Sequence, residues 1–124
     1  MEFPVDLRKA LQSFRYAGKG IADLFIYENN ARIHLFAAVS AITAGFYFGL
    51  STTEWALLIT QIALVWAAEA FNTALEKLAD AVSSDYHPLI KSTKDLAAAG
   101  VLIVAISAAI VGVLIFLPKI LLLF

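Results

Sequence analysis

A row of polar side chains directly follows a long apolar run, at Glu69, Asn72, Thr73, Glu76 and Asp80. On a helix these positions fall on one face about 100° wide. Carboxylate and amide oxygens without cysteine suit a hard cation such as Mg²⁺ better than zinc. Magnesium is usually held by one or two carboxylates together with a substrate phosphate. The row therefore predicts a site where magnesium and a nucleotide bind together.

Glu69 is the most informative residue of this row. It directly follows the uncharged run Trp55–Ala68 and therefore lies at the edge of a membrane. An unpaired carboxylate at that depth costs at least about 2.5 kcal/mol, which makes it a candidate functional residue. The alternative is that the row simply faces water where the helix leaves the membrane. That alternative explains Asp80 well and Glu76 adequately, but it explains Glu69 and Asn72 poorly, because their neighbours are apolar.

Basic residues that could neutralise phosphate lie further along the chain, at Lys91 and Lys94, next to Asp95. The triplet at 18–20 lacks the upstream glycine and the following Ser or Thr of a phosphate-binding P-loop. The two histidines, at 34 and 87, are too far apart in sequence to indicate a metal pair. For each histidine the alternative is an interfacial or capping role.

The composition indicates which elements position these residues. Of the 124 residues, 61% are hydrophobic and 15% are charged, whereas soluble domains are about 45–50% apolar. Three runs are long enough for a hydrocarbon core of about 30 Å. We predict an all-α membrane protein with spanning helices at about 33–50, 55–82 and 94–117, the last ended by Pro118. A net charge of −1 argues against nucleic acid as a partner, and the absence of cysteine excludes disulfides and thiolate chemistry.

The flanking charges predict the orientation. Eight of the nine Lys and Arg residues lie before the first span or between the uncharged apolar parts of the second and third, at 55–68 and 96–117. This side should face the cytoplasm, which leaves the C-terminus outside. The segment at about 5–28 has an apolar stripe opposite basic residues and should be a helix lying in the headgroup plane, with docking on a soluble partner as the alternative. Its stripe is formed by Leu7, Leu11, Phe14, Gly18, Ile21 and Phe25.

Small residues recur at every fourth position in two of the spans, a spacing that lets helices approach closely in lipid. They are Ala37, Ala41, Gly45 and Gly49 in the first span, and the pairs Ala105/Ala109 and Ala108/Gly112 in the third. Three thin helices can hardly enclose a polar site by themselves. A homo-oligomer is therefore expected.

The row Glu69–Asp80, followed by Tyr86-His87-Pro88 and by Lys91–Gly100, resembles the bacterial integral-membrane diacylglycerol kinase and undecaprenol kinase family. The resemblance covers nearly the whole chain and extends upstream through Glu28–His34. It implies a trimer with a surface helix and three membrane helices per subunit, with sites built between subunits. It also implies transfer of the γ-phosphoryl of ATP to a lipid alcohol at the cytoplasmic face of the bacterial inner membrane.

The same resemblance implies a role for each matching residue. Glu69 would be the catalytic base, and Glu28 and Glu76 would bind Mg²⁺. The acceptor lipid would be bound by Glu69, Arg32 and His34. ATP would be bound by Tyr16, Glu28, Asn72, Glu76, Asp85, Tyr86, His87, Lys94 and Asp95.

Two questions remain open at this stage. The segment Asn30–His34 and the His-Pro after Tyr86 look more like the undecaprenol kinase branch, because the diacylglycerol kinase branch usually has an acidic residue at position 34. Undecaprenol is therefore the expected acceptor and diacylglycerol the alternative. A pore or a transporter component would explain Glu69, but not the cytoplasmic grouping of Glu28, Glu76, Lys94 and Asp95. A scaffold whose polar row pairs with a partner helix would not bind Mg-ATP at all.

Overall fold

The computed structural model describes residues 4–124, and every regular element in that range is an α-helix. The helices are α1 (Leu7–Tyr27), α2 (Asn29–Phe48), α3 (Thr52–Val82) and α4 (Pro88–Leu121). Three of them, α2, α3 and α4, are long and apolar enough to cross a membrane. The predicted all-α class with three spanning helices is confirmed.

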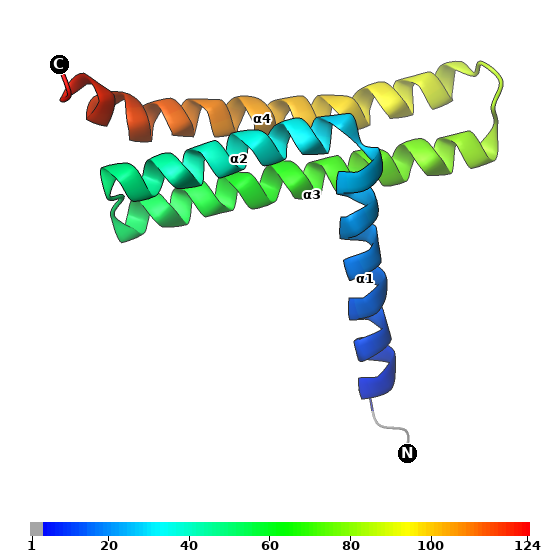
Figure 1. Ribbon diagram of the computed structural model, residues 1–124. Coiled ribbons are helices and arrows are strands. Elements are labelled where there is room, and N and C mark those ends of the chain that lie inside the picture. Colours follow the sequence, from blue (N-terminus) through cyan, green and yellow to red (C-terminus); the bar gives the residue numbers. More distant parts are fainter. Residues whose placement is uncertain (1–3) are drawn as a thin grey trace.

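Figure 1 shows α2, α3 and α4 side by side, with α1 standing across them. Helices α3 and α4 pack against each other as a long hairpin, whereas α2 accompanies the first part of α3 only. With 31 residues, α3 is about 46 Å long, well beyond a hydrocarbon core of about 30 Å. The last part of α3 and the start of α4 continue past the corner between α1 and α2 (Figure 1).

The turn between α2 and α3 explains why these helices end where they do. Gly49 adopts a left-handed conformation with φ +71°, which favours glycine, and its N–H donates to the Gly45 carbonyl. Ser51 then caps α3: its Oγ accepts from the Glu54 N–H at 3.2 Å, while the Ser51 N–H donates to Glu54 Oε1 at 3.0 Å. Residues 52–54, which lie between the predicted spans at 33–50 and 55–82, thus form the first turn of α3.

Helix α4 extends beyond its predicted bounds at both ends. It begins at Pro88, a residue suited to a first turn because it has no N–H to satisfy, with the His87 side chain accepting from the Leu89 N–H. The expectation that Pro118 ends the helix was wrong, because α4 continues to Leu121. Lys119 Nζ contacts Glu54 Oε2 at 2.7 Å, which ties this last turn to the start of α3.

The core is small and lies near the α2–α3 turn. Leu50, Leu58 and Ile115 form it, and the Trp55 ring packs beside them and against Phe46, with ring centroids 4.9 Å apart. Most large apolar side chains on α2, α3 and α4 are instead exposed. An apolar surface of this extent is stable in lipid or against other subunits. The chain is an integral membrane protein.

The small residues of α2 and α4 line a cavity within the chain. This cavity, of about 460 Å³, lies between α2, α3 and α4. Its small lining residues are Ala37, Ala38, Ala41, Ala44, Ala105, Ala108, Ala109 and Gly112. Gly45 packs closely instead, since a Cβ there would lie 2.6 Å from Trp55 Cη2. Most of these small residues therefore line open space and do not bring two helices into close contact.

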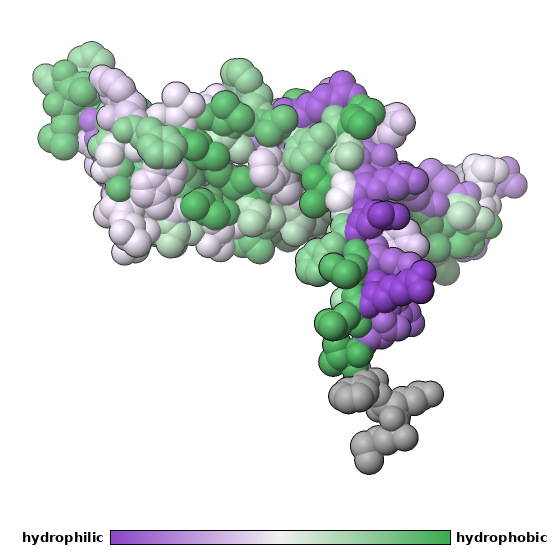
Figure 2. Space-filling model, turned by 60° about the horizontal axis from the view of Figure 1, so that its bottom comes forward, coloured by the Kyte–Doolittle hydropathy of each residue, from purple (hydrophilic) through white to green (hydrophobic). Residues whose placement is uncertain are grey.

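Helix α1 carries its hydrophobic and hydrophilic side chains on opposite sides. In Figure 2 the hydrophobic side faces toward the part of the bundle that holds the α2–α3 turn, and the hydrophilic side faces the opposite way. Asp6 caps the helix by accepting from the Lys9 N–H at 3.1 Å. The apolar side chains of α1 are well exposed, as at Leu11 and Phe14.

Candidate active site

Glu69 is the one buried charged side chain among the described residues, with 2% of its surface exposed. It lies on α3, and the nearest ion-pair partner is His34 of α2, whose Nε2 is 3.2 Å from Glu69 Oε1. The contact lacks hydrogen-bond alignment, so within residues 4–124 this carboxylate oxygen has a close neighbour but no hydrogen bond. A buried carboxylate in that condition is costly unless it binds a further group.

Other polar atoms on the same face of α3 share this condition. Trp66 Nε1, Asn72 Oδ1 and Thr73 Oγ1 are buried and form no hydrogen bond with any described residue. The amide nitrogen of Asn72 makes one long contact, 3.5 Å to Glu76 Oε1. Buried polar atoms are nearly always paired, so this face has unused capacity for a ligand or for another subunit.

The corner between α1 and α2 is fixed by Arg32. Its Nε donates to the Phe25 carbonyl at 3.1 Å, and a second guanidinium nitrogen donates to the carbonyl of Ile26. These carbonyls belong to the last turn of α1, which would otherwise lack partners there. Phe25 also packs edge-on against Trp66, with centroids 5.2 Å apart, which joins the corner to α3.

Glu28 lies at this corner, where it ends α1 and precedes α2. Its side chain lines a cavity of about 310 Å³ between α1 and α3, together with Asp23, Thr73 and Lys77. The cavity thus brings Glu28 of the corner to the polar face of α3. Glu76, on the same helix one turn beyond Asn72, is half-buried.

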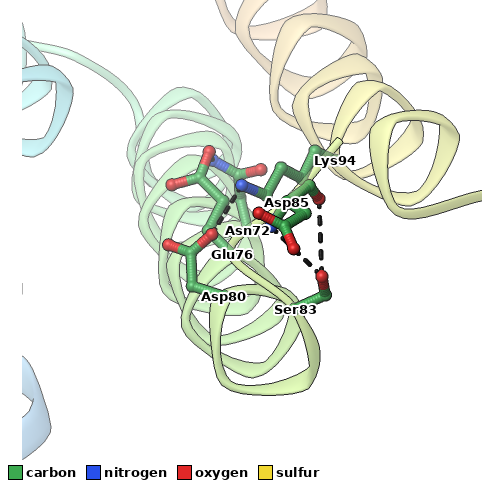
Figure 3. Close-up of polar contacts among 6 residues, drawn as sticks. All are labelled: Asn72, Glu76, Asp80, Ser83, Asp85 and Lys94. Carbon is green, nitrogen blue, oxygen red and sulfur yellow. Dashed lines mark hydrogen bonds and ion pairs between the residues drawn. The ribbon is translucent and has the colours of Figure 1, made fainter. Parts of the chain in front are cut away.

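A second polar group lies where the α3–α4 hairpin extends past the corner. Lys94 Nζ of α4 contacts Asp80 Oδ1 of α3 at 2.7 Å, and Figure 3 shows Glu76 and Asn72 beside this pair. A cavity of about 270 Å³ opens at the hairpin loop. The predicted ATP-binding residues that line it are Asp85, Tyr86, His87, Lys94 and Asp95.

The structure does not bring all predicted residues together within one chain. Tyr16 lies on the free part of α1 with 68% of its surface exposed. No three His, Asp or Glu side chains converge as a metal centre within residues 4–124. The oxygen donors near the corner are nevertheless of the right kind for magnesium: the Glu28 and Glu76 carboxylates and the unpaired Asn72 oxygen. Magnesium needs only one or two carboxylates when phosphate oxygens and water complete its shell.

Comparison with known proteins matches residues 15–116 to the family model described as prokaryotic diacylglycerol kinase. The chain belongs to this family. It is 38% identical over 114 residues to the undecaprenol kinase of Bacillus subtilis strain 168, covering 92% of this chain and 93% of that protein. It is 44% identical over 112 residues to a Synechocystis diacylglycerol kinase, covering 90% of this chain but 64% of that longer protein.

The diacylglycerol kinase of Escherichia coli strain K12 is also similar, with 30% identity over 102 residues, 82% of this chain and 84% of that protein. The resemblance seen in the sequence motifs is therefore confirmed, as is the predicted enzyme class, a lipid kinase. The relatives that match most of the chain are named for two different lipid acceptors, undecaprenol and diacylglycerol. Membership in the family therefore leaves the acceptor of this kinase open.

Sequence reasoning missed two features of this kinase's site. Trp66 carries an unpaired buried nitrogen, and Arg32 holds the corner together. Trp66 could have been found from spacing, since it lies three residues before Glu69 on the same helical face as the predicted polar row. The bonds of Arg32 depend on the angle between α1 and α2, which no local pattern encodes. Its predicted role in lipid binding remains a prediction.

Proposed function

We propose that this kinase phosphorylates undecaprenol with ATP and Mg²⁺ at the cytoplasmic face of the bacterial inner membrane. The observation that carries the proposal is the burial of Glu69 at the corner of α1 and α2, between an apolar cavity and the polar hairpin. A lipid alcohol can approach from the membrane, while a water-soluble nucleotide approaches along the hairpin. A pore would not require a lipid and a nucleotide to reach the same carboxylate.

Phosphoryl transfer depends on alignment and on neutralising charge, with little covalent help from the protein. In the proposed reaction Glu69 takes the proton of the lipid hydroxyl, and Lys94 faces the phosphates. The nucleotide is held by Asn72 and by the residues of the hairpin loop, with Tyr16 reaching it from α1. Glu28 and Glu76 would hold magnesium, which supplies positive charge to the phosphate oxygens when bound.

The membrane placement follows from the same corner. Helix α1 lies in the headgroup plane with its hydrophobic side toward the membrane, which is supported by the distribution of side chains in Figure 2. The distribution of basic residues supports an orientation with the N-terminus and the α3–α4 loop in the cytoplasm and the C-terminus outside.

We further propose a homo-trimer whose sites lie between subunits. Two observations support an oligomer: the exposed apolar surface of the spanning helices and the unpaired buried atoms around Glu69. A neighbouring chain would supply partners to such atoms and bring its own α1, with Tyr16, near the hairpin. Chemical crosslinking in mild detergent would measure the subunit number directly.

The choice of acceptor favours undecaprenol for two reasons. The Bacillus subtilis relative named undecaprenol kinase covers nearly all of both chains. Position 34, in contact with Glu69, is a histidine rather than the acidic residue usual in the diacylglycerol kinase branch. The alternative is diacylglycerol, which the names of the Synechocystis and Escherichia coli relatives favour.

The deciding experiment compares the two lipids in the same detergent with radiolabelled ATP and magnesium. We expect at least about tenfold higher kcat/KM for undecaprenol, because a difference of about 1.4 kcal/mol in transition-state binding has that effect. An equal or larger value for the diacylglycerol would overturn the acceptor assignment but keep the kinase. Ion flux in nucleotide-free liposomes, with no phosphorylation of either lipid, would overturn the kinase itself.

A further inference from the structure

Glu69 needs a partner that the proposed mechanism has not yet supplied. A base must keep one carboxylate oxygen free for the proton that it accepts. If its other oxygen is buried without a hydrogen bond, the carboxylate is both destabilised and free to rotate. Oε1 is in this position, because it is buried and lacks an aligned donor among the described residues.

The groups that face His34 and Glu69 from each packed helix are few. From α2 comes the His34 ring, with Nε2 at 3.2 Å from Oε1 and about a quarter of its side chain exposed. At the corner between α1 and α2, the guanidinium of Arg32 of α2 is occupied by backbone carbonyls of α1. The α4 residues lining the adjoining cavity are apolar or glycine, and none of them titrates. Ion pairs within residues 4–124 give Glu69 no partner besides His34.

We propose that His34 is the positioning residue of Glu69, rather than a residue that binds the lipid directly. Its Nε2–H donates to Glu69 Oε1, and this bond turns Oε2 toward the acceptor hydroxyl. The two atoms are already within hydrogen-bond distance, so a change of orientation alone aligns the bond. Catalytic hydrogen bonds are often poorly aligned before substrate binds and tighten in the reacting complex. The inference rests on the proposed kinase reaction.

The reaction balances with His34 in this role. The lipid hydroxyl gives its proton to Glu69 Oε2, and its oxygen forms a bond to the γ-phosphorus. The bond between that phosphorus and the bridging oxygen of ATP breaks, and ADP leaves. His34 keeps its own proton throughout, so a side chain with an N–H donor but no titration can replace it.

This difference defines the test. In His34→Gln the amide retains an N–H donor near the former Nε2, whereas His34→Ala retains none. Lipid phosphorylation is measured for both at saturating undecaprenol, with KM for ATP determined separately. We expect His34→Ala to lower kcat about 100-fold with an unchanged KM for ATP, since small misplacements of a catalytic group cost about this much. His34→Gln should stay within about tenfold of the unmodified kinase, because its bond to Oε1 is kept.

Thr43→Ala is the matched control on the same helix. Its hydroxyl donates to the Val39 carbonyl of its own helix at 2.8 Å and does not touch Glu69. Its kcat should be unchanged. If His34→Ala turns over lipid like the unmodified kinase, the positioning role is wrong. If His34→Gln is as inactive as His34→Ala, a donor is not what the site requires, and the role is also wrong.

These failures are distinct from failure of the proposed function. An inactive unmodified protein would overturn the kinase assignment before His34 is considered. If His34→Ala does not fold, the Gln variant alone decides: its activity near that of the unmodified kinase supports the donor, and its inactivity as a folded protein overturns it. Circular dichroism and size-exclusion chromatography in detergent establish the folded state.

Discussion

At one end of the α3–α4 hairpin the polar side chains are paired with each other, and around Glu69 they are not. Near the α2–α3 turn, Ser51 and Glu54 cap each other, and Glu54 also binds Lys119. Around Glu69, four polar atoms are buried without hydrogen bonds in the described chain. The hydrogen bonds and the ion pair at the paired end stabilise the hairpin. The buried atoms without partners around Glu69 lower the stability of the fold, as expected where a ligand binds.

The largest expected effect therefore comes from Glu69→Gln. Removing the charge removes the proposed base, and kcat for lipid phosphorylation should fall by roughly 1,000-fold or more, toward the upper range of general-base effects. ATP binding should survive, because Glu69 is not assigned to the nucleotide. Radiolabel transfer and binding of a fluorescent ATP analogue measure the two quantities.

Glu76→Gln is the matched comparison for that experiment. It should shift the magnesium concentration needed for half-maximal activity upward, while some turnover remains at high magnesium, since one of two proposed carboxylate ligands is lost. A Glu69→Gln enzyme that still phosphorylates lipid normally would remove Glu69 from its role as base. It would also weaken the contrast between the paired end of the hairpin and the region around Glu69.

A smaller effect, on stability rather than activity, is expected at the paired end. In Gly45→Ala the new Cβ would lie 2.6 Å from Trp55 Cη2 and 3.1 Å from Leu50 Cδ1. Trp55 also packs against Phe46 and the small core, so the clash is not easily relieved. Overpacking of this kind costs about 1–3 kcal/mol. Thermal denaturation in detergent should show a lower melting temperature.

Gly112→Ala provides the control for that substitution. Gly112 lies within α4 at the central cavity, and a Cβ there would meet nothing within 4 Å. Alanine is the better helix former, so this variant should be as stable as the unmodified protein or more stable. Equal melting temperatures for the two variants would mean that the packing of Trp55 against Gly45 adds nothing to stability.

Features that depend on residues close together in sequence could be predicted from the sequence, and features that depend on the packing of distant helices could not. The break from apolar to polar at Glu69 lies within one helix, so hydropathy and helical period were enough to find it. The capping box at Ser51 was equally local and could have been found from its Ser-x-x-Glu spacing. The contact of His34 with Glu69 depends instead on the packing of α2 against α3, and the corner at Arg32 depends on an angle between helices.

The end of the third span was misjudged for a related reason. Proline was taken as a stop, but it removes only one backbone hydrogen bond near the end of α4. The final turn is held by Lys119 reaching Glu54, which lies in a helix distant in sequence. The low helix propensity of Pro118 predicted that α4 ends there, but the contact between Lys119 and Glu54 holds one further turn.

The smallest expected effect tests that tertiary contact directly. Glu54→Gln and Lys119→Met each break the pair between α3 and α4, and each should lower the melting temperature less than Gly45→Ala does. Exposed pairs add little to stability, and both side chains here are about a quarter exposed. A double-mutant cycle isolates the interaction energy between the two side chains. If they stabilise the protein only through their pair, the double variant should be no less stable than the less stable of the two single variants. Additive losses would mean that the two side chains act separately, and the last turn of α4 would then need another cause. Lipid phosphorylation should be unchanged in all three proteins, since the pair lies at the end of the hairpin far from Glu69.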